Sequence, residues 1–218
     1  QKLAGANGLQ HLDYCSYFVK VHPDQGSRLF DEATLARAFH PTGCHYGTLR
    51  RAYPIPSHEL YRSVLLLRDP RDCLVSHYYS VRDSHTLNNR GNLEARREAL
   101  RTDIDQWVLG KASEYGQDFE QFHTRLVGKP GVLFLRYEEM VTAFPDFLRK
   151  IVAHTGLDQD QEAFARILEE ADFEVSGENL LAHKRSVKPG NHLKKLKPET
   201  VDRLNGALAE VLELFDYR

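Results

Sequence analysis

The chain has 218 residues, a length that leaves room for one domain or for two very small ones. Its 29 Lys and Arg residues nearly balance its 31 Asp and Glu residues, so the formal net charge is -2, which argues against a protein that covers nucleic acid or an anionic membrane by bulk charge. Because 41% of the residues are hydrophobic and 28% are charged, the composition indicates a globular chain and not a disordered one. No apolar run reaches the roughly 20 residues that a membrane span needs.

The first part of the chain alternates short helices and strands. The expected elements are the tail of a helix within 1–12, a strand at 17–21, an amphipathic helix at 31–39 and a strand at 43–47. The clearest element is SVLLLR at 63–68, a continuous apolar run typical of a strand that is buried on both faces of a parallel sheet. Asp69 and Pro70 follow as an N-cap and a first helical residue, and predict a helix to about His85.

The second part repeats this order. A loop is expected at 87–92, a helical stretch at 93–127 with breaks near Gly110 and Gly116, and a second buried strand at 131–137. Helices at about 144–155, 160–171 and 198–215 and a long loop at 172–198 complete the pattern. Strands that alternate with helices predict one α/β domain over 1–218, with a parallel sheet flanked by helices.

The three cysteines, Cys15, Cys44 and Cys73, are odd in number and have no CxxC spacing. Alone they form neither a disulfide framework nor a thiolate metal site, so they favour a reducing compartment, and we expect a cytoplasmic protein. The chain begins at Gln1 within a helical pattern, and we expect that a leading segment is missing from it.

The strongest candidate site lies where the strand 63–68 ends. Ligands of open α/β sheets bind at the carboxyl ends of the strands, and Arg68 at this end offers a planar fork of donors that suits a phosphate. Ser76 lies eight residues later, two helical turns along the following helix, so the two side chains are candidates to hold one anion. The alternative is an Arg at a strand end and a Ser on a solvated helix face.

A second candidate site is the basic loop 184–197, which carries six Lys and Arg residues and no acid. Its glycine, Gly190, offers backbone N–H groups for an anion, although a charge run is usually a solvated surface. His45 is a candidate general base at a strand end, although a lone His is more often structural. The motifs GxxxxGK[ST], GxGxxG, HExxH and GxSxG are absent from the sequence, and the histidines have no metal-ligand spacing.

Four segments in order resemble the sulfotransferases that use 3′-phosphoadenosine 5′-phosphosulfate (PAPS). They are LLLRDPRDCLVSHYYS at 65–80, FLRYEEM at 134–140, ADFE at 171–174 and RSVKPGNH at 185–192. The resemblance covers roughly residues 43–215 and implies a three-layer fold like that of the P-loop nucleoside triphosphatases (NTPases), with a central parallel sheet between helices.

The resemblance also implies a role for each site residue. Arg68, Ser76, Arg185 and Gly190 would hold the 3′-phosphate, Tyr137 and Phe173 would contact the adenine, and His45 would be the catalytic base. The implied reaction moves a sulfuryl group from PAPS to a hydroxyl or amine of a small-molecule, carbohydrate or lipid acceptor. The product is 3′-phosphoadenosine 5′-phosphate (PAP), and the reaction needs neither a metal nor nucleic acid.

Several positions depart from the family pattern. The loop that binds the 5′-phosphosulfate is absent from the sequence, Gly43 stands where the family has Lys, and Val187 and His192 stand where it has Gly and Trp. Two alternatives therefore stay open. One is another P-loop nucleotide kinase or phosphotransferase, and the other is a non-catalytic nucleotide-binding homologue.

Overall fold

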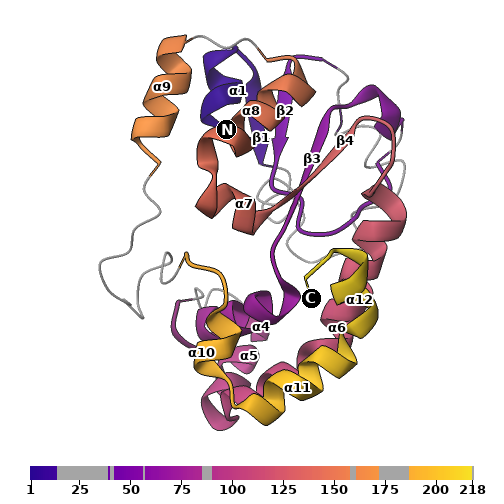
Figure 1. The fold of residues 1–218 in the computed structure, drawn as a ribbon, viewed down its shortest axis with the longest axis vertical. Helices are drawn as coiled ribbons and strands as arrows, with labels where there is room; N and C mark the ends of the chain where they lie inside the picture. The colour runs from indigo at the N-terminus through magenta and orange to yellow at the C-terminus, as the bar shows by residue number, and fades with distance from the viewer. Residues whose placement is uncertain are drawn as a thin grey trace. The chain divides into compact units, whose positions relative to one another are not determined.

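The computed structural model describes residues 1–13, 39, 42–55, 57–84, 90–157, 161–171 and 187–217 (Figure 1). Their contacts divide the chain into two compact units. The first unit comprises residues 1–66, 121–135 and 143–172, and the second comprises 67–120, 136–142 and 173–218. That the whole chain is one domain stays a prediction. The expected strand at 17–21 and nearly all of the helix at 31–39 lie outside the described residues.

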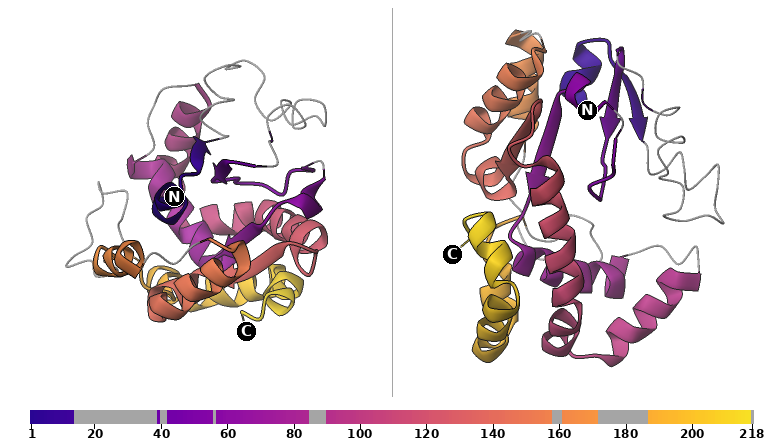
Figure 2. Two further views of the ribbon diagram at one scale, coloured as in Figure 1. Left: turned by 90° about the horizontal axis from the view of Figure 1, so that it is seen from above. Right: turned by 90° about the vertical axis from the view of Figure 1, so that its right-hand side faces the viewer.

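The first unit contains two short parallel strands. Helix α1 (Lys2–Ala6) is followed by β1 (Gln10–Asp13), which pairs in parallel with β2 (Cys44–Gly47). Gly8 turns the chain between α1 and β1 with a φ of 71°, a value that favours glycine. Figures 1 and 2 show the two strands side by side, and His11 lies directly opposite His45 in their register. The sequence predicted β2 correctly but did not predict β1.

The first unit also contains a 3-10 turn at His58–Leu60 and two amphipathic helices. They are α8 (Phe144–Thr155) and α9 (Gln161–Glu169), close to the predicted positions. Leu148 and Val152 of α8 pack with Leu3 of α1 in a buried cluster that α9 covers with partly buried apolar side chains. This cluster is the hydrophobic core of α1, α8 and α9.

Strands β3 (Ser63–Leu67) and β4 (Val132–Arg136) form a second two-stranded sheet. The N–H of Ser63 donates to the carbonyl of Gly131 at 2.8 Å, so the two strands begin side by side. Beyond their other ends the N–H of Asp69 donates to Glu138 Oε1 at 3.1 Å. Neighbours at both ends mean that the strands run in the same direction, as the sequence predicted.

One expectation about β3 is wrong. Leu65 and Leu67 are buried, but Val64 is 37% exposed and Leu66 is 41% exposed. The sequence predicted burial on both faces because the run is apolar throughout. The side chains on one face of β3 are buried and those on the other face are partly exposed. Because every residue of 64–67 is apolar, the sequence alone does not distinguish the two faces.

The second unit is helical. It contains α4 (Pro70–Tyr79), which continues in a π-helical turn at Ser80–Ser84, then α5 (Arg90–Arg101), most of α6 (Ile104–Leu126), α7 (Tyr137–Thr142), α10 (Asn191–Lys195), α11 (Pro198–Ala207) and α12 (Ala209–Leu214). Figures 1 and 2 show α11 and α12 beside α6. Fully buried apolar side chains from these helices include Leu74, Val108, Leu204, Leu208 and Phe215.

The helix boundaries correct three predictions. The break in 93–127 is at 102–103, where the Asp103 side chain accepts the N–H of Asp105 at 3.0 Å and so caps α6. Gly116 lies inside α6, where a side chain would face Leu208, the residue between α11 and α12. The closing helix is divided at Leu208 into α11 and α12, and the described part of the predicted loop 172–198 contains the short helix α10.

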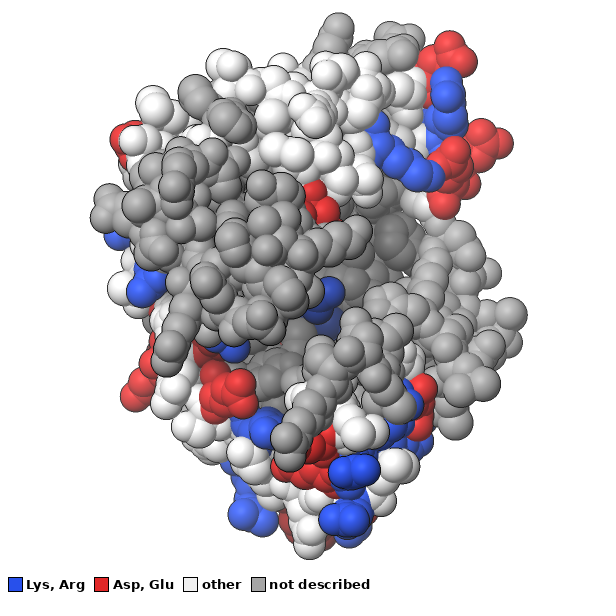
Figure 3. Space-filling view, turned by 180° about the vertical axis from the view of Figure 1, so that it is seen from behind, with Lys and Arg blue, Asp and Glu red and all other residues white. Residues whose placement is uncertain are grey.

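Cys44 and Cys73 are free thiols, and Cys15 lies outside the described residues. Within the described ranges no helix is long and apolar enough to cross a membrane. On the face drawn in Figure 3, Lys and Arg side chains are interspersed with Asp and Glu side chains, as the net charge of -2 leads one to expect.

Candidate functional site

Arg68 stands immediately after β3, at the carboxyl end of the strand. Its side chain is only 13% exposed, and its guanidinium lies 4.7 Å from the centre of the Tyr137 ring, within the range of a cation–π contact. Its Nη2 donates to Asp72 Oδ2 at 3.1 Å and approaches the carbonyl of Lys188 at 3.4 Å. Its Nε is buried and has no hydrogen-bond partner among the described residues. A buried donor without a partner is rare and needs an explanation, and a ligand oxygen as its missing partner is the one that we test below.

The start of α4 is fixed by Asp69. The Asp69 carboxylate accepts the N–H of Arg71 at 2.9 Å and also pairs with the Arg71 side chain, which donates further to Asn205 Oδ1 and the carbonyl of Tyr217. The predicted N-cap is therefore confirmed. Arg71 is engaged on all sides by protein, whereas Arg68 keeps a donor for a ligand.

Asp72 connects Arg68 to the loop 187–190 and to α10. Its carboxylate is fully buried and accepts the N–H of Gly190 at 2.9 Å, the N–H of His192 at 2.9 Å and Nδ1 of His192 at 2.7 Å, in addition to Arg68. Burial alone raises the pKa of this carboxyl, but the hydrogen bonds from His192 and the charge of Arg68 outweigh it and lower the pKa to about 2. Asp72 is therefore ionised at neutral pH and holds the basic loop against α4.

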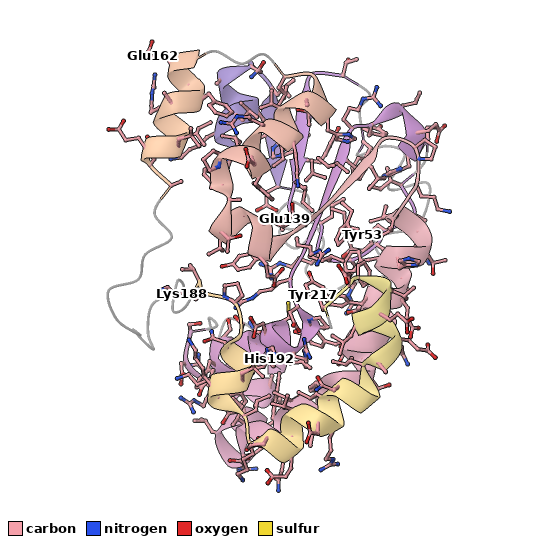
Figure 4. The ribbon with its side chains drawn as sticks, viewed as in Figure 1. Tyr53, Glu139, Glu162, Lys188, His192 and Tyr217 are labelled. Carbon is pink, nitrogen blue, oxygen red and sulfur yellow. The ribbon has the colours of Figure 1, made fainter. Side chains whose placement is uncertain are left out.

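The sequence predicted Tyr137 as the last residue of a strand at 131–137. In the structure β4 ends at Arg136, and Tyr137 is the first residue of α7. Its hydroxyl donates to the carbonyl of Val187 at 3.1 Å, and burial raises the pKa of this hydroxyl. Figure 4 shows Lys188 and His192 on the segment that leads into and forms α10. We refer below to Arg68, Asp72, Tyr137, Gly190 and His192 as the Arg68 cluster.

His45 belongs to the first unit, where it pairs with His11. The Nδ1 atoms of the two imidazoles lie 2.9 Å apart, and the ring centres lie 5.0 Å apart with an angle of 26° between the ring planes. Burial, followed by nearby positive charge that includes His11, lowers the pKa of His45. The imidazole is therefore neutral at pH 7 and is suited to accept a proton. We call His11 and His45 the histidine pair.

The profile of the sulfotransferase domain matches residues 57–199, a stretch that includes the whole Arg68 cluster. The chain belongs to the sulfotransferase family. Human sulfotransferase 1C2 is 27% identical over 122 residues, which are 55% of this chain and 38% of that protein. The match thus spans well under half of the length of this relative.

Solved structures show the same fold as this sulfotransferase chain. Mouse sulfotransferase SULT7A1 complexed with PAP has a TM-score of 0.59 and 16% identity, over 99% of this chain and 92% of the other. Retinol dehydratase complexed with retinol and PAP has a TM-score of 0.54 and 19% identity, over 91% and 61%. The domain profile thus confirms the predicted family, and the solved structures confirm its α/β fold.

The structure brings together Arg68, Tyr137 and Gly190 of the predicted sulfotransferase site. Ser76 is half-buried on α4, one turn beyond Asp72, and its part in binding stays a prediction. Phe173 and Arg185 lie outside the described residues, so their roles are untested, as is that of His45. Within the described ranges no group of three His, Cys, Asp or Glu side chains is arranged to hold a metal ion.

Sequence reasoning missed three members of the two sites. Asp72 stands one helical turn after Arg68, a spacing that allows an ion pair, and this was the available signal. His192 was noted only as a departure from the family Trp. His11 gave no signal, because β1 was not predicted.

Proposed function

We propose that this chain is a sulfotransferase that takes its sulfuryl group from PAPS. The observation that carries the proposal is the buried, unpartnered Nε of Arg68 at the carboxyl end of a parallel strand. Family membership and the PAP named in the structures that share the fold support it. The acid that contacts this guanidinium, Asp72, forms an ion pair with Arg68 at 3.1 Å.

The residues of the Arg68 cluster fit the 3′-phosphate of the donor. An arginine that lies over the ring of Tyr137 and is hydrogen-bonded to Asp72 presents its remaining N–H groups in a fixed direction. Ser76 from α4 and Arg185 from the basic loop would supply further donors, and Phe173 would contact the adenine. Binding of the 3′-phosphate, which is remote from the sulfuryl group, would then position that sulfuryl group for transfer.

PAPS, when bound, supplies an activated sulfuryl group. The transfer is an in-line displacement that depends on positioning and on cationic stabilisation, as phosphoryl transfer does. In this chain His45 would accept the proton of the attacking hydroxyl or amine at its ring nitrogen. Burial raises the pKa of the Cys73 thiol to about 12, so this cysteine stays protonated and plays no part as a nucleophile.

The proposed acceptor is a small molecule, with a carbohydrate or a lipid headgroup as the broader possibilities. The complexes of retinol dehydratase with retinol and with androsterone favour the first of these. The free thiols Cys44 and Cys73 support a cytoplasmic protein.

Isothermal titration calorimetry with PAP and with AMP tests the proposal. Both nucleotides carry the adenine and the 5′-phosphate, so only the 3′-phosphate distinguishes them. We expect PAP to bind about 10- to 100-fold more tightly than AMP, as the loss of charge-assisted hydrogen bonds implies. Arg68→Ala should remove this preference, and Arg203→Ala, which deletes an exposed arginine of α11, should keep it.

Equal affinity for PAP and AMP in the unaltered chain would contradict the proposal. Tight and selective PAP binding without any turnover of PAPS would identify the chain as a non-catalytic nucleotide-binding homologue. Turnover that requires a metal ion and ATP would identify a phosphotransferase.

A further inference from the structure

His11 and His45 meet across two neighbouring parallel strands. They occupy the same position in the register of β1 and β2, their ring planes are inclined at 26° to one another, and their Nδ1 atoms lie 2.9 Å apart. The strand register places the two rings side by side, and the distance between the two Nδ1 atoms is that of a hydrogen bond. The contact lies wholly within the first unit.

A hydrogen bond between two imidazoles restricts which ring nitrogens carry protons. A hydrogen bond between two imidazole nitrogens needs one N–H and one lone pair, so one Nδ1 is protonated and the other is not. In a neutral pair only two arrangements exist. Either His45 donates from Nδ1 and has a lone pair on Nε2, or His11 donates from Nδ1 and His45 carries its proton on Nε2. Only the first arrangement leaves His45 able to take a proton from a substrate.

Gly47 holds the two rings in this contact. A Cβ at position 47 would lie 2.6 Å from Cε1 of His11 and 3.3 Å from Cε1 of His45. The first distance is far below van der Waals contact, so any side chain at this position displaces the His11 ring. The two imidazoles are therefore seated against the backbone of β2, and only glycine leaves them room.

We propose that His11 is a positioning residue for His45: it accepts the Nδ1–H of His45 and so leaves Nε2 of His45 free to act as the base. The inference rests on the proposed function, in which His45 is that base. As the acceptor oxygen bonds to sulfur, the bond from sulfur to the 5′-phosphate oxygen breaks and PAP leaves with the electron pair. The acceptor O–H bond breaks as well, and its proton goes to Nε2 of His45.

The role of His11 in this step is to stabilise the positive charge that His45 gains. The hydrogen bond from Nδ1 of an imidazolium is stronger than that from a neutral ring, so the contact favours the protonated state of His45 as the reaction proceeds. An orienting partner on the far nitrogen of a catalytic histidine is usually a carboxylate. A neutral imidazole can also accept this hydrogen bond and orient the catalytic ring, although it carries no negative charge. In this chain the imidazole is that of His11 on the neighbouring strand.

Nitrogen-15 NMR of the full chain labelled at its histidine rings tests the inference without any substrate. We expect His45 to show a protonated Nδ1, an unprotonated Nε2 and a nitrogen–nitrogen coupling across the hydrogen bond to His11. His154 is an internal control in the same unit, because its Nε2 lies 3.0 Å from the carbonyl of Ser63 and 3.1 Å from that of Gly131 and must carry its proton there.

Two variants separate positioning from packing. His11→Phe keeps a ring but removes the acceptor, and should abolish the coupling and shift the His45 proton to Nε2. His11→Asn places an amide oxygen near the former Nδ1 and should restore the Nδ1–H form of His45. Both are compared by urea unfolding with the unaltered chain, so that a folding defect is recognised.

An unaltered chain in which His45 carries its proton on Nε2, or in which no coupling joins the two rings, overturns the inference. Failure of the proposed function appears elsewhere, as equal affinity for PAP and AMP. The two results are independent, because the NMR measurement uses neither nucleotide nor acceptor.

Discussion

The Arg68 cluster and the histidine pair use polar side chains in different ways. The cluster is buried and charged, and its central contact joins Asp72 to His192 across 120 residues of sequence. The pair has one exposed and one half-buried member, and the described contact between the two rings is a single side-chain hydrogen bond. In the cluster the contacts that orient the proposed phosphate ligand also stabilise the fold. In the pair the contact serves the proposed chemistry, and the fold depends on it little.

The largest effect is expected from Asp72→Asn. The amide keeps the shape of the side chain but leaves the buried guanidinium of Arg68 without its charge partner, so we expect the free energy of unfolding to fall by about 3 kcal/mol. Urea denaturation at pH 7 measures this loss. Calorimetry should show weaker PAP binding in the same variant, since Arg68 and the loop 187–190 lose their common anchor.

The matched control for this change is Asp202→Asn, which removes an exposed carboxylate of α11. Its free energy of unfolding should stay within about 0.5 kcal/mol of that of the unaltered chain. A loss below about 1 kcal/mol for Asp72→Asn would mean that the cluster is not a structural anchor, and the contrast with the histidine pair would disappear.

The second effect is a loss of stability in acid. The pKa of Asp72 is lowered from an ordinary value of 3.8 to about 2, so its contribution is fully present above pH 4 and is lost as the pH falls through 2. The shift corresponds to about 2 kcal/mol. The difference in unfolding free energy between the unaltered chain and Asp72→Asn should therefore narrow by this amount between pH 5 and pH 2.

This comparison isolates one carboxylate from the others. Hydrogen bonds from the backbone of Lys197 and from Thr200 lower the pKa of Asp105 against the effect of burial, and Asp105 is present in both proteins. Its titration therefore cancels in the difference. A difference that stays constant with pH would show that the proton affinity of Asp72 is the same in the folded and unfolded chains.

The sequence was sufficient for the local features of the Arg68 cluster. Arg68 and the cap at Asp69 are determined by the order strand, turn and helix, which is visible as an apolar run followed by Asp-Pro. The contact between Asp72 and His192 was not predictable, because it depends on how distant segments pack. A buried carboxylate on a helix has no periodic signature of its own until its partners are known.

The fold shows the same division. Strands β3 and β4 and helices α8 and α9 were predicted because their apolar spacing is strong. The break before α6 was placed at the wrong residues, because glycine in a helix carries only a weak penalty and the cap at Asp103 decides the boundary. Strand β1 has four residues and gains its stability from pairing with β2, so neither it nor His11 was found.

A smaller effect is expected from Gly47→Ala, which tests the seating of the histidine pair. The added Cβ meets Cε1 of His11, a ring at the surface that can move, so we expect the free energy of unfolding to fall by about 1 kcal/mol. Nitrogen-15 NMR should show that the coupling between His11 and His45 is lost. In the control Gly5→Ala, where no atom lies within 4 Å of the new Cβ, stability should be unchanged or raised by about 0.5 kcal/mol.

The smallest change in stability is expected from His11→Phe, together with a large change in turnover. His11 is exposed and makes its described hydrogen bond to one neighbour, so the free energy of unfolding should stay within about 0.5 kcal/mol of the original value. Turnover of PAPS with 4-nitrophenol as acceptor should fall about 10- to 100-fold, because His45 then carries its proton on the nitrogen that must accept one. His11→Asn should recover most of this loss, since an amide oxygen replaces the acceptor. If instead both variants lose stability and turnover in parallel, the pair supports the fold in the way that the Arg68 cluster does, and the distinction between the two sites is wrong.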